Sequence, residues 1–259
     1  MESVTIGKAT LFLGDCMEGL QDTQGKAFDL AIVDPPYGIN SPNMQMGSHP
    51  NRSKYDGFGS GPAVSTAVKL KGRLNQGGGK LKNRLLNQSD IAWDCAVPTQ
   101  EYFDKLFFVS WNQIIWGGNY FPLRPTRCVV CWDKCQPWEN FSQWEMAWTS
   151  FDKPAALYRC SNTGGANKET KIHPTQKPIP LYKWLLYKFA KPDQLILDTH
   201  MGSGSSVIAA LSMGFPITAF ETNPEYFYAA CERIERAQQQ LHMPHNERAH
   251  QQLTLNNPP

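Results

Sequence analysis

Apolar runs in the first part of the chain predict short strands. The most compact is Phe28–Val33, in which Asp29 is the one polar side chain. A run of this length, bounded by polar segments, is typical of a strand buried on both faces of a sheet. Apolar and polar residues alternate between Val4 and Leu13, which predicts one or two strands ahead of it.

The middle of the chain adds one helix and three strands. The helix is predicted from Glu101 to Val109, directly after Pro98-Thr99. The strands are predicted at Gln113–Trp116, Arg127–Trp132 and Glu145–Phe151. Tryptophans are concentrated here, and we expect most of them in the core or lining a pocket, because large aromatic side chains dominate buried area.

Strands and helices alternate in the last third of the chain. The predicted elements are a helix at Ile179–Ala190, a strand at Gln194–Asp198, a helix at Val207–Met213, a strand at Pro216–Phe220 and a helix from Asn223 to about Gln240. Such alternation predicts a parallel sheet with helices packed on its faces, which is the α/β class.

One long segment breaks this pattern. Residues 38–90 have little apolar periodicity and are rich in Gly, Ser and Asn. Segments of this length without regular structure are usually functional or disordered. We therefore expect a single domain over residues 1–259, with residues 38–90 as a basic flexible insertion and residues 242–259 as a polar tail.

Composition narrows the class of protein. The chain has 259 residues, 41% hydrophobic residues and a net charge of +2, which is too small to indicate a nucleic-acid partner by itself. No apolar run is long enough for a membrane span, and the N-terminus lacks a signal-peptide pattern. We therefore expect a cytoplasmic protein, encoded by a bacterium or a phage, with no membrane partner.

The seven cysteines do not form a disulfide framework, because their number is odd and their spacing is scattered. Cys128, Cys131 and Cys135 come nearest to a metal-binding spacing. In a strand, however, side chains alternate between the two faces, which separates Cys128 from Cys131. We expect buried thiols here and no metal site.

The polar motif after the Phe28–Val33 run is Asp34-Pro35-Pro36-Tyr37. It begins at the carboxyl end of a predicted strand, where open α/β sheets bind their ligands. Two prolines hold the chain extended and lack N–H groups, which leaves the carbonyls of Asp34 and Pro35 free to accept. A carboxylate, a fixed carbonyl and an aromatic ring suit a planar group that bears an NH2, such as the exocyclic amine of a nucleobase. A plain polar turn is the alternative.

A second candidate site follows the strand that ends in Asp198. Gly202 and Gly204 form a turn before a helix, and Glu221 ends the next strand about 20 residues after the turn, as in nucleotide-binding βαβ units. There is no third glycine at the dinucleotide spacing and no phosphate-binding lysine. A ligand with ribose and adenine but no phosphate remains, and S-adenosylmethionine is such a ligand.

Together these motifs resemble the amino-group DNA methyltransferases, which methylate adenine N6 or cytosine N4. Asp34–Tyr37 matches the catalytic signature of that family, and Asp198–Ser205 loosely matches its cofactor signature. The catalytic motif comes first, as in the permuted β subgroup. His173–Pro178 resembles the segment that precedes the cofactor motif in this subgroup. Gly14-Asp15-Cys16 resembles its N-terminal element that contacts the adenine of the cofactor, although Asp15 is equally suited to cap a short helix.

The resemblance implies a fold and a set of site residues. The fold is a Rossmann-like S-adenosylmethionine-dependent methyltransferase fold, circularly permuted, with a mostly parallel seven-stranded sheet and an inserted basic loop region. The implied catalytic residues are Asp34, Pro35, Pro36 and Tyr37. The implied cofactor-binding residues are Asp15, Cys16, Asp34, His173, Thr175, Lys177, Asp198, Thr199, His200, Gly202, Ser203, Gly204, Ser205, Glu221 and Thr222.

Two of these assignments have alternatives. Thr199 and His200 stand where the family usually has Pro-Phe, so His200 is either a packing imidazole or a general base. Lys177 is a candidate for binding the carboxylate of the cofactor, or else a solvated lysine of a loop.

The basic insertion supplies the predicted DNA contacts. Because it directly follows the catalytic motif, we favour a flap that touches phosphates over a merely solvated loop. Its candidate residues are Arg52, Lys54, Lys69, Lys71, Arg73, Lys80, Lys82 and Arg84. The partner expected from this pattern is double-stranded DNA; a homodimer and an accompanying restriction enzyme are left open.

The resemblance implies methylation of adenine N6 after the base is flipped out of the duplex. By resemblance to the family, Asp rather than Ser at position 34 favours adenine over cytosine N4, although the acceptor geometry permits both. The alternatives are an N4-cytosine methyltransferase, a methyltransferase for protein glutamine or RNA, and a DNA-binding relative without turnover.

Overall fold

The computed structural model describes residues 1–39, 94–135, 142–161 and 171–242. Its helices are α1 (Cys16–Gly19), α3 (Gln100–Val109), α4 (Ile179–Phe189), α5 (Ser205–Ser212) and α6 (Pro224–His242). Its strands are β1 (Glu2–Ile6), β2 (Ala9–Leu13), β3 (Phe28–Val33), β4 (Ser110–Trp116), β5 (Val129–Asp133), β6 (Trp144–Thr149), β7 (Ala156–Arg159), β8 (Ile196–Asp198) and β9 (Ile217–Glu221).

The strands form one sheet in the order β1-β2-β9-β8-β3-β4-β6-β5-β7. The five strands from β2 to β4 in this order are mutually parallel, whereas β1 and β6 pair antiparallel with their neighbours and β7 is parallel to β5. The unit β8-α5-β9 from the end of the chain thus enters the sheet between β2 and β3 from its beginning. This interleaving agrees with the permuted motif order.

The prediction of a mostly parallel, Rossmann-like sheet is confirmed, but the predicted number of seven strands is wrong. The described residues contain nine strands. The Val4–Leu13 segment, for which one or two strands were predicted, contributes two, because β1 at the outer edge forms a hairpin with β2. At the other edge β7, which pairs only with β5, was not predicted. The sequence of β7, ALYR, is too short for a periodicity to be seen.

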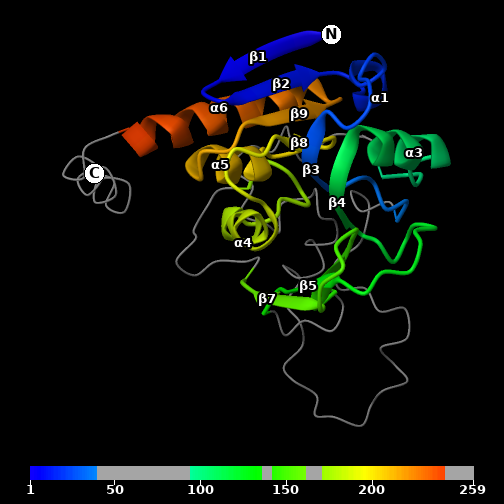
Figure 1. Ribbon diagram of the computed structural model, residues 1–259. Helices are drawn as coiled ribbons and strands as arrows, with labels where there is room; N and C mark the ends of the chain where they lie inside the picture. The colour runs from blue at the N-terminus through cyan, green and yellow to red at the C-terminus, as the bar shows by residue number, and fades with distance from the viewer. Residues whose placement is uncertain (40–93, 136–141, 162–170, 243–259) are drawn as a thin grey trace, which may run out of the picture.

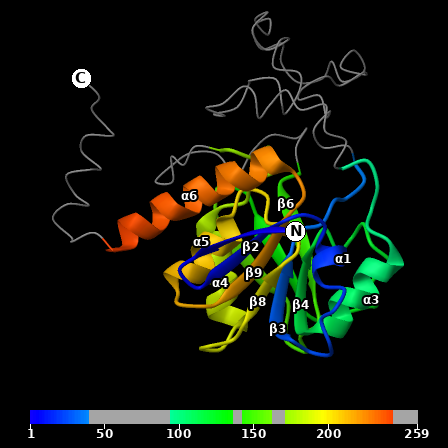
Figure 2. The ribbon, with the colours of Figure 1, turned by 90° about the horizontal axis from the view of Figure 1, so that it is seen from above.

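Helices cover both faces of the sheet (Figure 1 and Figure 2). α4, α5 and α6 lie on one face, and α1 and α3 on the other. Alternation along β3 explains this arrangement, because successive side chains point to opposite faces. Leu30 and Ile32 belong to the core under α4–α6, whereas Ala31 and Val33 belong to the core under α1 and α3.

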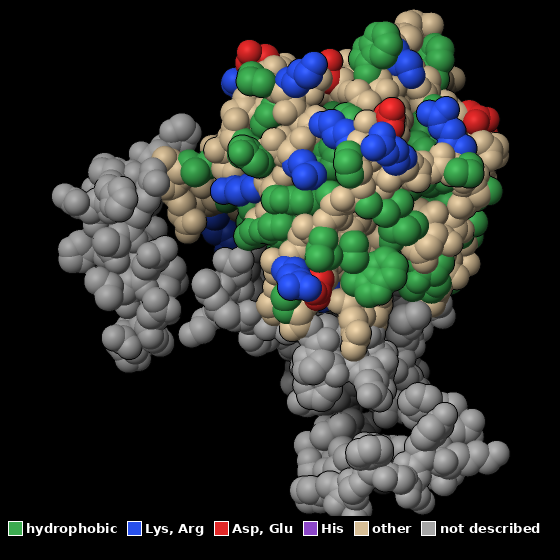
Figure 3. Space-filling view, turned by 60° about the horizontal axis from the view of Figure 1, so that its bottom comes forward, with side chains coloured by type: hydrophobic (Ala, Val, Ile, Leu, Met, Phe, Trp, Pro, Cys, Tyr) green, Lys and Arg blue, Asp and Glu red, His purple; other side chains and the backbone are tan. Residues whose placement is uncertain are grey.

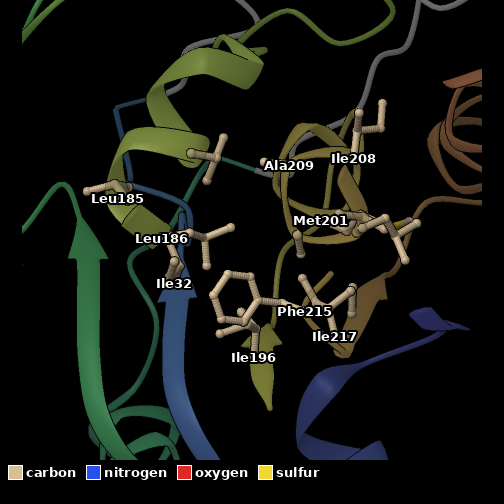
Figure 4. Close-up of a cluster of buried hydrophobic side chains, with 14 of the residues drawn as sticks. Ile32, Leu185, Leu186, Ile196, Met201, Ile208, Ala209, Phe215 and Ile217 are labelled. Carbon is tan, nitrogen blue, oxygen red and sulfur yellow. The ribbon is translucent and has the colours of Figure 1, made fainter. Parts of the chain in front are cut away.

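The core on the α4–α6 side is the larger of the two. In Figure 4 aliphatic side chains of β3, β8 and β9 point toward those of α4 and α5. Ile196 and Ile217 are 1% exposed, and Leu185 and Ala209 are fully buried. Burial of this much apolar area fixes the central strands, and with them the positions of the residues that follow their carboxyl ends.

Most element boundaries differ from the predictions by a few residues. β3 has the predicted bounds, whereas β4 begins at Ser110 and α5 at Ser205. α6 extends to His242, which removes this residue from the predicted tail; residues 243–259 lie outside the described part. None of the described helices is both long and apolar enough to cross a membrane.

Candidate active site

Four neighbouring parallel strands bring the candidate residues to one edge of the sheet. β2, β9, β8 and β3 lie side by side in that order. Each of their carboxyl ends carries an acidic side chain, namely Asp15, Glu221, Asp198 and Asp34. Parallel strands place their carboxyl ends at the same edge. The two motifs identified in the sequence, about 160 residues apart, therefore meet at adjacent strands, β3 and β8.

Asp34 is held by two donors. Its Oδ1 accepts from the Tyr37 hydroxyl at 2.6 Å, and its Oδ2 accepts from the Lys177 ammonium group. The Lys177 Nζ atom also lies 3.3 Å from the Tyr37 hydroxyl oxygen. Pro35 between them is buried, and Pro36 is half-buried. The predicted catalytic motif is thus a fixed unit whose carboxylate faces a lysine from another part of the chain.

Lys177 belongs to a larger buried ion network. Its Nζ atom lies 3.2 Å from Oε2 of Glu145 in β6, and Oε1 of Glu145 lies 2.6 Å from the Lys134 Nζ atom. Burial raises the pKa of Asp34 above its usual value, against the opposing charge of Lys177. Burial alone would lower the pKa of Lys177, but the carboxylates of Asp34 and Glu145 raise it overall. Lys177 is therefore charged at neutral pH.

Asp94 fixes the backbone of the catalytic motif. Its Oδ1 accepts from the backbone N–H groups of Tyr37 at 2.6 Å and of Gly38 at 2.9 Å, and its side chain is almost fully buried. Sequence reasoning did not single out Asp94. No motif surrounds it, and the only signal is an acidic residue beside the apolar Trp93.

The ring of Tyr37 lies between several groups. It stacks on Tyr120 with ring centroids 5.0 Å apart and an angle of 15° between the planes, and it meets Phe121 edge-on at 6.1 Å. Tyr120 is 44% exposed, so the stack opens to solvent on one side. Gly117, at φ +71°, approaches the ring so closely that a Cβ atom there would lie 2.3 Å from Tyr37 Cε1.

This close approach yields a prediction about stability. Gly117→Ala is expected to lower the free energy of unfolding by about 1–3 kcal/mol more than Gly214→Ala does, because the new methyl group overpacks the Tyr37 ring. Gly214 is the matched control, since it also has a positive φ, +83°, but a Cβ atom there would meet no other residue's atoms within 4 Å apart from its chain neighbours. Urea unfolding of both variants measures the difference; equal losses would show that the ring moves aside freely.

The glycine turn after β8 has left-handed backbone at Gly202, φ +51°, and Gly204, φ +73°. The Glu221 carboxylate links this turn to the turn that follows β9. Its Oε2 accepts from the N–H of Gly202 at 2.9 Å, and its Oε1 accepts from the N–H of Asn223 at 2.9 Å. Burial raises the pKa of Glu221, while these N–H groups lower it. Thr222 beside it is exposed.

Asp198 lies beneath the turn and is 2% exposed. Its carboxylate accepts from the Ser206 hydroxyl and from the backbone N–H of His200, the latter at 3.0 Å. Burial raises the pKa of Asp198 to about 7, against these two hydrogen bonds. Asp198 therefore changes charge near neutral pH.

The raised pKa of Asp198 makes stability depend on pH. Between pH 4 and pH 7 the unfolded chain loses this proton while the folded chain keeps it, so the stability contributed by Asp198 falls as pH rises. The slope is at most about 1.4 kcal/mol per pH unit. Asp198→Asn keeps the shape without the charge: the amide oxygen can accept from the N–H of His200, and the NH2 group can donate to the Ser206 hydroxyl, which reverses the direction of that hydrogen bond. Its stability relative to wild type is expected to rise from pH 4 to pH 7 and then level off, as measured by denaturant unfolding; a constant difference would contradict this.

Two imidazoles flank the turn, and both are neutral. Burial, assisted by the charge of Lys177, lowers the pKa of His173 to about 3, and burial lowers the pKa of His200 to about 4. His173 packs edge-on against Tyr226 at 4.4 Å, and its Nδ1 atom is 3.1 Å from the hydroxyl of Thr175. A Cβ atom on Gly202 would be 3.7 Å from the His173 ring, so the segment that begins at His173 lies against the turn.

His200 is part of a hydrogen-bonded chain. Its Nδ1 atom is 2.9 Å from the Thr199 hydroxyl, which is 2.7 Å from the Tyr102 hydroxyl. Tyr102 on α3 also packs edge-on against the imidazole. A pKa near 4 and these contacts favour the packing alternative for His200 over a general base.

Arg233 of α6 supports the turn from behind and was missed by sequence reasoning. Its Nη1 donates to the carbonyl of Ser203 at 2.6 Å and to the Ser205 hydroxyl at 3.1 Å, and the residue is 7% exposed. The hydroxyls of Ser203 and Ser205 are 3.2 Å apart. The signal available in the sequence was an arginine on the apolar face of an amphipathic helix, next to Ile234, but periodicity does not reveal which turn it contacts.

The N-terminal element completes this edge. Oδ1 of Asp15 accepts from the N–H of Met17 at 2.8 Å, which confirms the helix-cap interpretation. Burial raises the pKa of Cys16 to about 12, so its thiol stays protonated. The backbone of Gly14 donates to the carbonyl of Glu221 at 2.9 Å. The eight predicted DNA-contacting residues, Arg52, Lys54, Lys69, Lys71, Arg73, Lys80, Lys82 and Arg84, lie outside the described residues.

Comparisons with known proteins find the following likenesses. The profile of the DNA methylase family N6_N4_Mtase matches residues 80–232, which is more than half of the chain. YubD of Escherichia coli strain K12, a proposed methylase, is 37% identical over 71 residues, 26% of this chain and 31% of that protein. The type II methyltransferase M.HpaI of Haemophilus parainfluenzae is 29% identical over 82 residues, 32% of this chain and 26% of that protein.

The matched segments thus span about a third or less of the length of these two relatives.

Among solved structures, M1.HpyAVI in complex with SAM aligns over 87% of this chain and 99% of its own, with 18% identity and a TM-score of 0.48. The cytosine-N4-specific PvuII DNA methyltransferase aligns over 90% of this chain and 92% of its own, with 12% identity and a TM-score of 0.48.

Proposed function

Since the chain belongs to the N6/N4 DNA methylase family, we propose that it transfers a methyl group from S-adenosylmethionine to the exocyclic amine of a base in double-stranded DNA, and that this base is adenine. The observation that carries the proposal is the pairing of β3 with β8. It puts the acceptor carboxylate of Asp34 beside the glycine turn that Asp198 begins.

The residues at the end of β8 and β9 fit S-adenosylmethionine. Glu221 presents a half-buried carboxylate next to the turn, and such a group suits a ribose diol. Gly202 has left-handed backbone, φ +51°, and no side chain, which suits a turn whose backbone lies close to a ligand. When bound there, S-adenosylmethionine supplies an electrophilic methyl group on a sulfonium. Asp15, Cys16, Thr175, Ser203, Ser205 and Thr222 remain proposed lining residues.

Asp34 and its neighbours act on the amine. An amine of a paired base cannot reach a carboxylate at the edge of the sheet, so the base has to leave the duplex. The Asp34 carboxylate and the Pro35 carbonyl then accept hydrogen bonds from the amine and orient the nitrogen lone pair out of the ring plane. Transfer of the methyl group would break its bond to the sulfonium and release a neutral thioether, and the positive charge would pass to the nitrogen. The nitrogen would then give up one proton, for which the Asp34 carboxylate is the acceptor.

Tyr37 is proposed to stack on the flipped base, and its surroundings support this role. Its ring already has an aromatic partner, Tyr120, at 5.0 Å on an open side of the site. Stacking of a base on an aromatic side chain contributes about 1–3 kcal/mol per base. Tyr120 has to move for a base to take its place, or else it extends the stack.

Contact with DNA is assigned to the basic segment. On the face shown in Figure 3, Lys and Arg side chains are scattered among hydrophobic ones and form no single patch. We propose that the lysines and arginines between Arg52 and Arg84 contact the phosphates, since they follow the catalytic motif directly.

The decisive experiment is analysis of the modified nucleosides. Purified protein is incubated with unmethylated duplex DNA and isotope-labelled S-adenosylmethionine, and the digested DNA is analysed by mass spectrometry. Labelled N6-methyladenine is the expected product. Labelled N4-methylcytosine would overturn the choice of base but retain the reaction, and transfer to RNA or peptide in place of DNA would overturn the substrate class.

A further inference from the structure

The buried ion network around Asp34 has a function beyond stabilising the fold. We propose that Lys177, held between Asp34 and Glu145, is a positioning residue that keeps the Asp34 carboxylate ionised and oriented for the amine, and that Glu145 sets the strength of this effect. The inference rests on the proposed function and deepens it. It also replaces binding of the cofactor carboxylate as the role of Lys177.

The geometry leaves Lys177 little capacity for another ligand. Its side chain is 3% exposed, and its ammonium group contacts Oδ2 of Asp34 and lies 3.2 Å from Oε2 of Glu145. The ammonium group also lies 5.3 Å from the ring centre of Trp116 and 5.7 Å from that of Tyr37. Two carboxylates and two aromatic rings thus surround the ammonium group of Lys177. Its three N–H groups point at these protein groups and not at a ligand.

The charges of the network balance. The network consists of two carboxylates, Asp34 and Glu145, and two lysines, Lys177 and Lys134, so its formal charges sum to zero. Glu145 stands between the two lysines, with Oε1 2.6 Å from Lys134. Removing either partner of a buried pair leaves an uncompensated charge, which costs more than the pair itself contributes. The pKa of Asp34 therefore depends on both neighbours: the charge of Lys177 lowers it, and the charge of Glu145 raises it.

Other titratable groups face Asp34 from the surrounding elements. Tyr37 donates to it, Tyr182 of α4 is buried nearby with a raised pKa, and His173 is neutral. Asp198 of β8 adds a carboxylate that interacts repulsively with Asp34. Among these groups Lys177 is the one cation in direct contact with Asp34 in the described residues.

The test uses charge changes of opposite sign in the full-length protein. Lys177→Met is expected to raise the pKa of Asp34 by about 1–3 units, and Glu145→Gln to lower it. The ascending limb of the pH profile of kcat/KM for DNA methylation moves in the same directions. The double variant regains charge balance and is expected to return toward the wild-type profile, and Lys177→Arg to stay close to it. Lys183→Met, an exposed lysine of α4, is the control for charge.

Two readouts separate this inference from the proposed function. Carboxyl carbon NMR follows the titration of Asp34 whether or not methyl transfer is observed, and calorimetry gives the affinity for S-adenosylmethionine. The expected result is an affinity within about twofold of wild type for Lys177→Met together with a raised Asp34 pKa. A large loss of affinity with an unchanged Asp34 titration would overturn the proposal and restore the cofactor-carboxylate role. Shifts of equal sign in both single variants would also overturn it.

Discussion

Asp34→Asn is expected to reduce the rate of methyl transfer by about 1,000-fold, the scale of a lost general base or a lost charged acceptor. The amide has nearly the same shape as the carboxylate, so it isolates the charge. Its NH2 group cannot accept from the amine of the base, and the neutral side chain cannot take the proton that the nitrogen releases. The amide also faces Lys177, whose ammonium group then lacks one of its two carboxylate partners.

Affinity for S-adenosylmethionine is the second half of this prediction. Asp34 follows β3, whereas the glycine turn follows β8, so the loss is expected in the chemical step and not in cofactor binding. Calorimetry on Asp34→Asn should give a dissociation constant within about threefold of wild type, less than 1 kcal/mol. Asp104→Asn, an exposed aspartate of α3, is the control. If Asp34→Asn lost methyl transfer and affinity for S-adenosylmethionine together, Asp34 would belong to the cofactor site.

The parts of the fold that the sequence predicted are those whose signal is local. Phe28–Val33 is a continuous apolar run, and β3 has these bounds. The motifs that begin at Asp34 and Asp198 were each predicted to follow a strand of a parallel sheet, and the structure shows that these strands, β3 and β8, are neighbours. Asp15 could be read as a helix cap from its own neighbours, and it is one.

The parts that it missed are contacts between distant segments. Glu145 lies in the middle of a strand with no motif, yet it joins Lys177 and Lys134. Asp94 reaches back 57 residues to Tyr37, and Arg233 reaches back 30 residues to Ser203. Local spacing carries no information about such pairs. Lys177 was singled out for its place in a motif, but its partner Glu145 is brought to it by the pairing of β6 with β4, the strand next to β3.

Glu221→Ala is expected to weaken binding of S-adenosylmethionine by about 10- to 100-fold, because a hydrogen bond to a charged group contributes about 1.5–3 kcal/mol. The carboxylate has two tasks. It is proposed to accept from the ribose hydroxyls, and it already accepts from the N–H groups of Gly202 and Asn223. Truncation removes the proposed ribose contact. It also removes the acceptor for the N–H groups of Gly202 and Asn223, so the backbone of the turn is no longer fixed for the ligand.

Glu221→Gln separates these two tasks. The amide oxygen can still accept from one of the two backbone N–H groups, but the NH2 group faces the other donor, so one hydrogen bond to the turn is lost. The negative charge toward the ribose is lost as well. Its affinity is expected to lie between those of wild type and Glu221→Ala. Glu225→Gln, four residues further on and exposed, should bind as wild type does. In all three variants the chemical step at saturating cofactor is expected to change by less than about threefold, because Asp34 and Lys177 are untouched. An unchanged dissociation constant for Glu221→Ala would mean that the ligand lies elsewhere along this edge of the sheet.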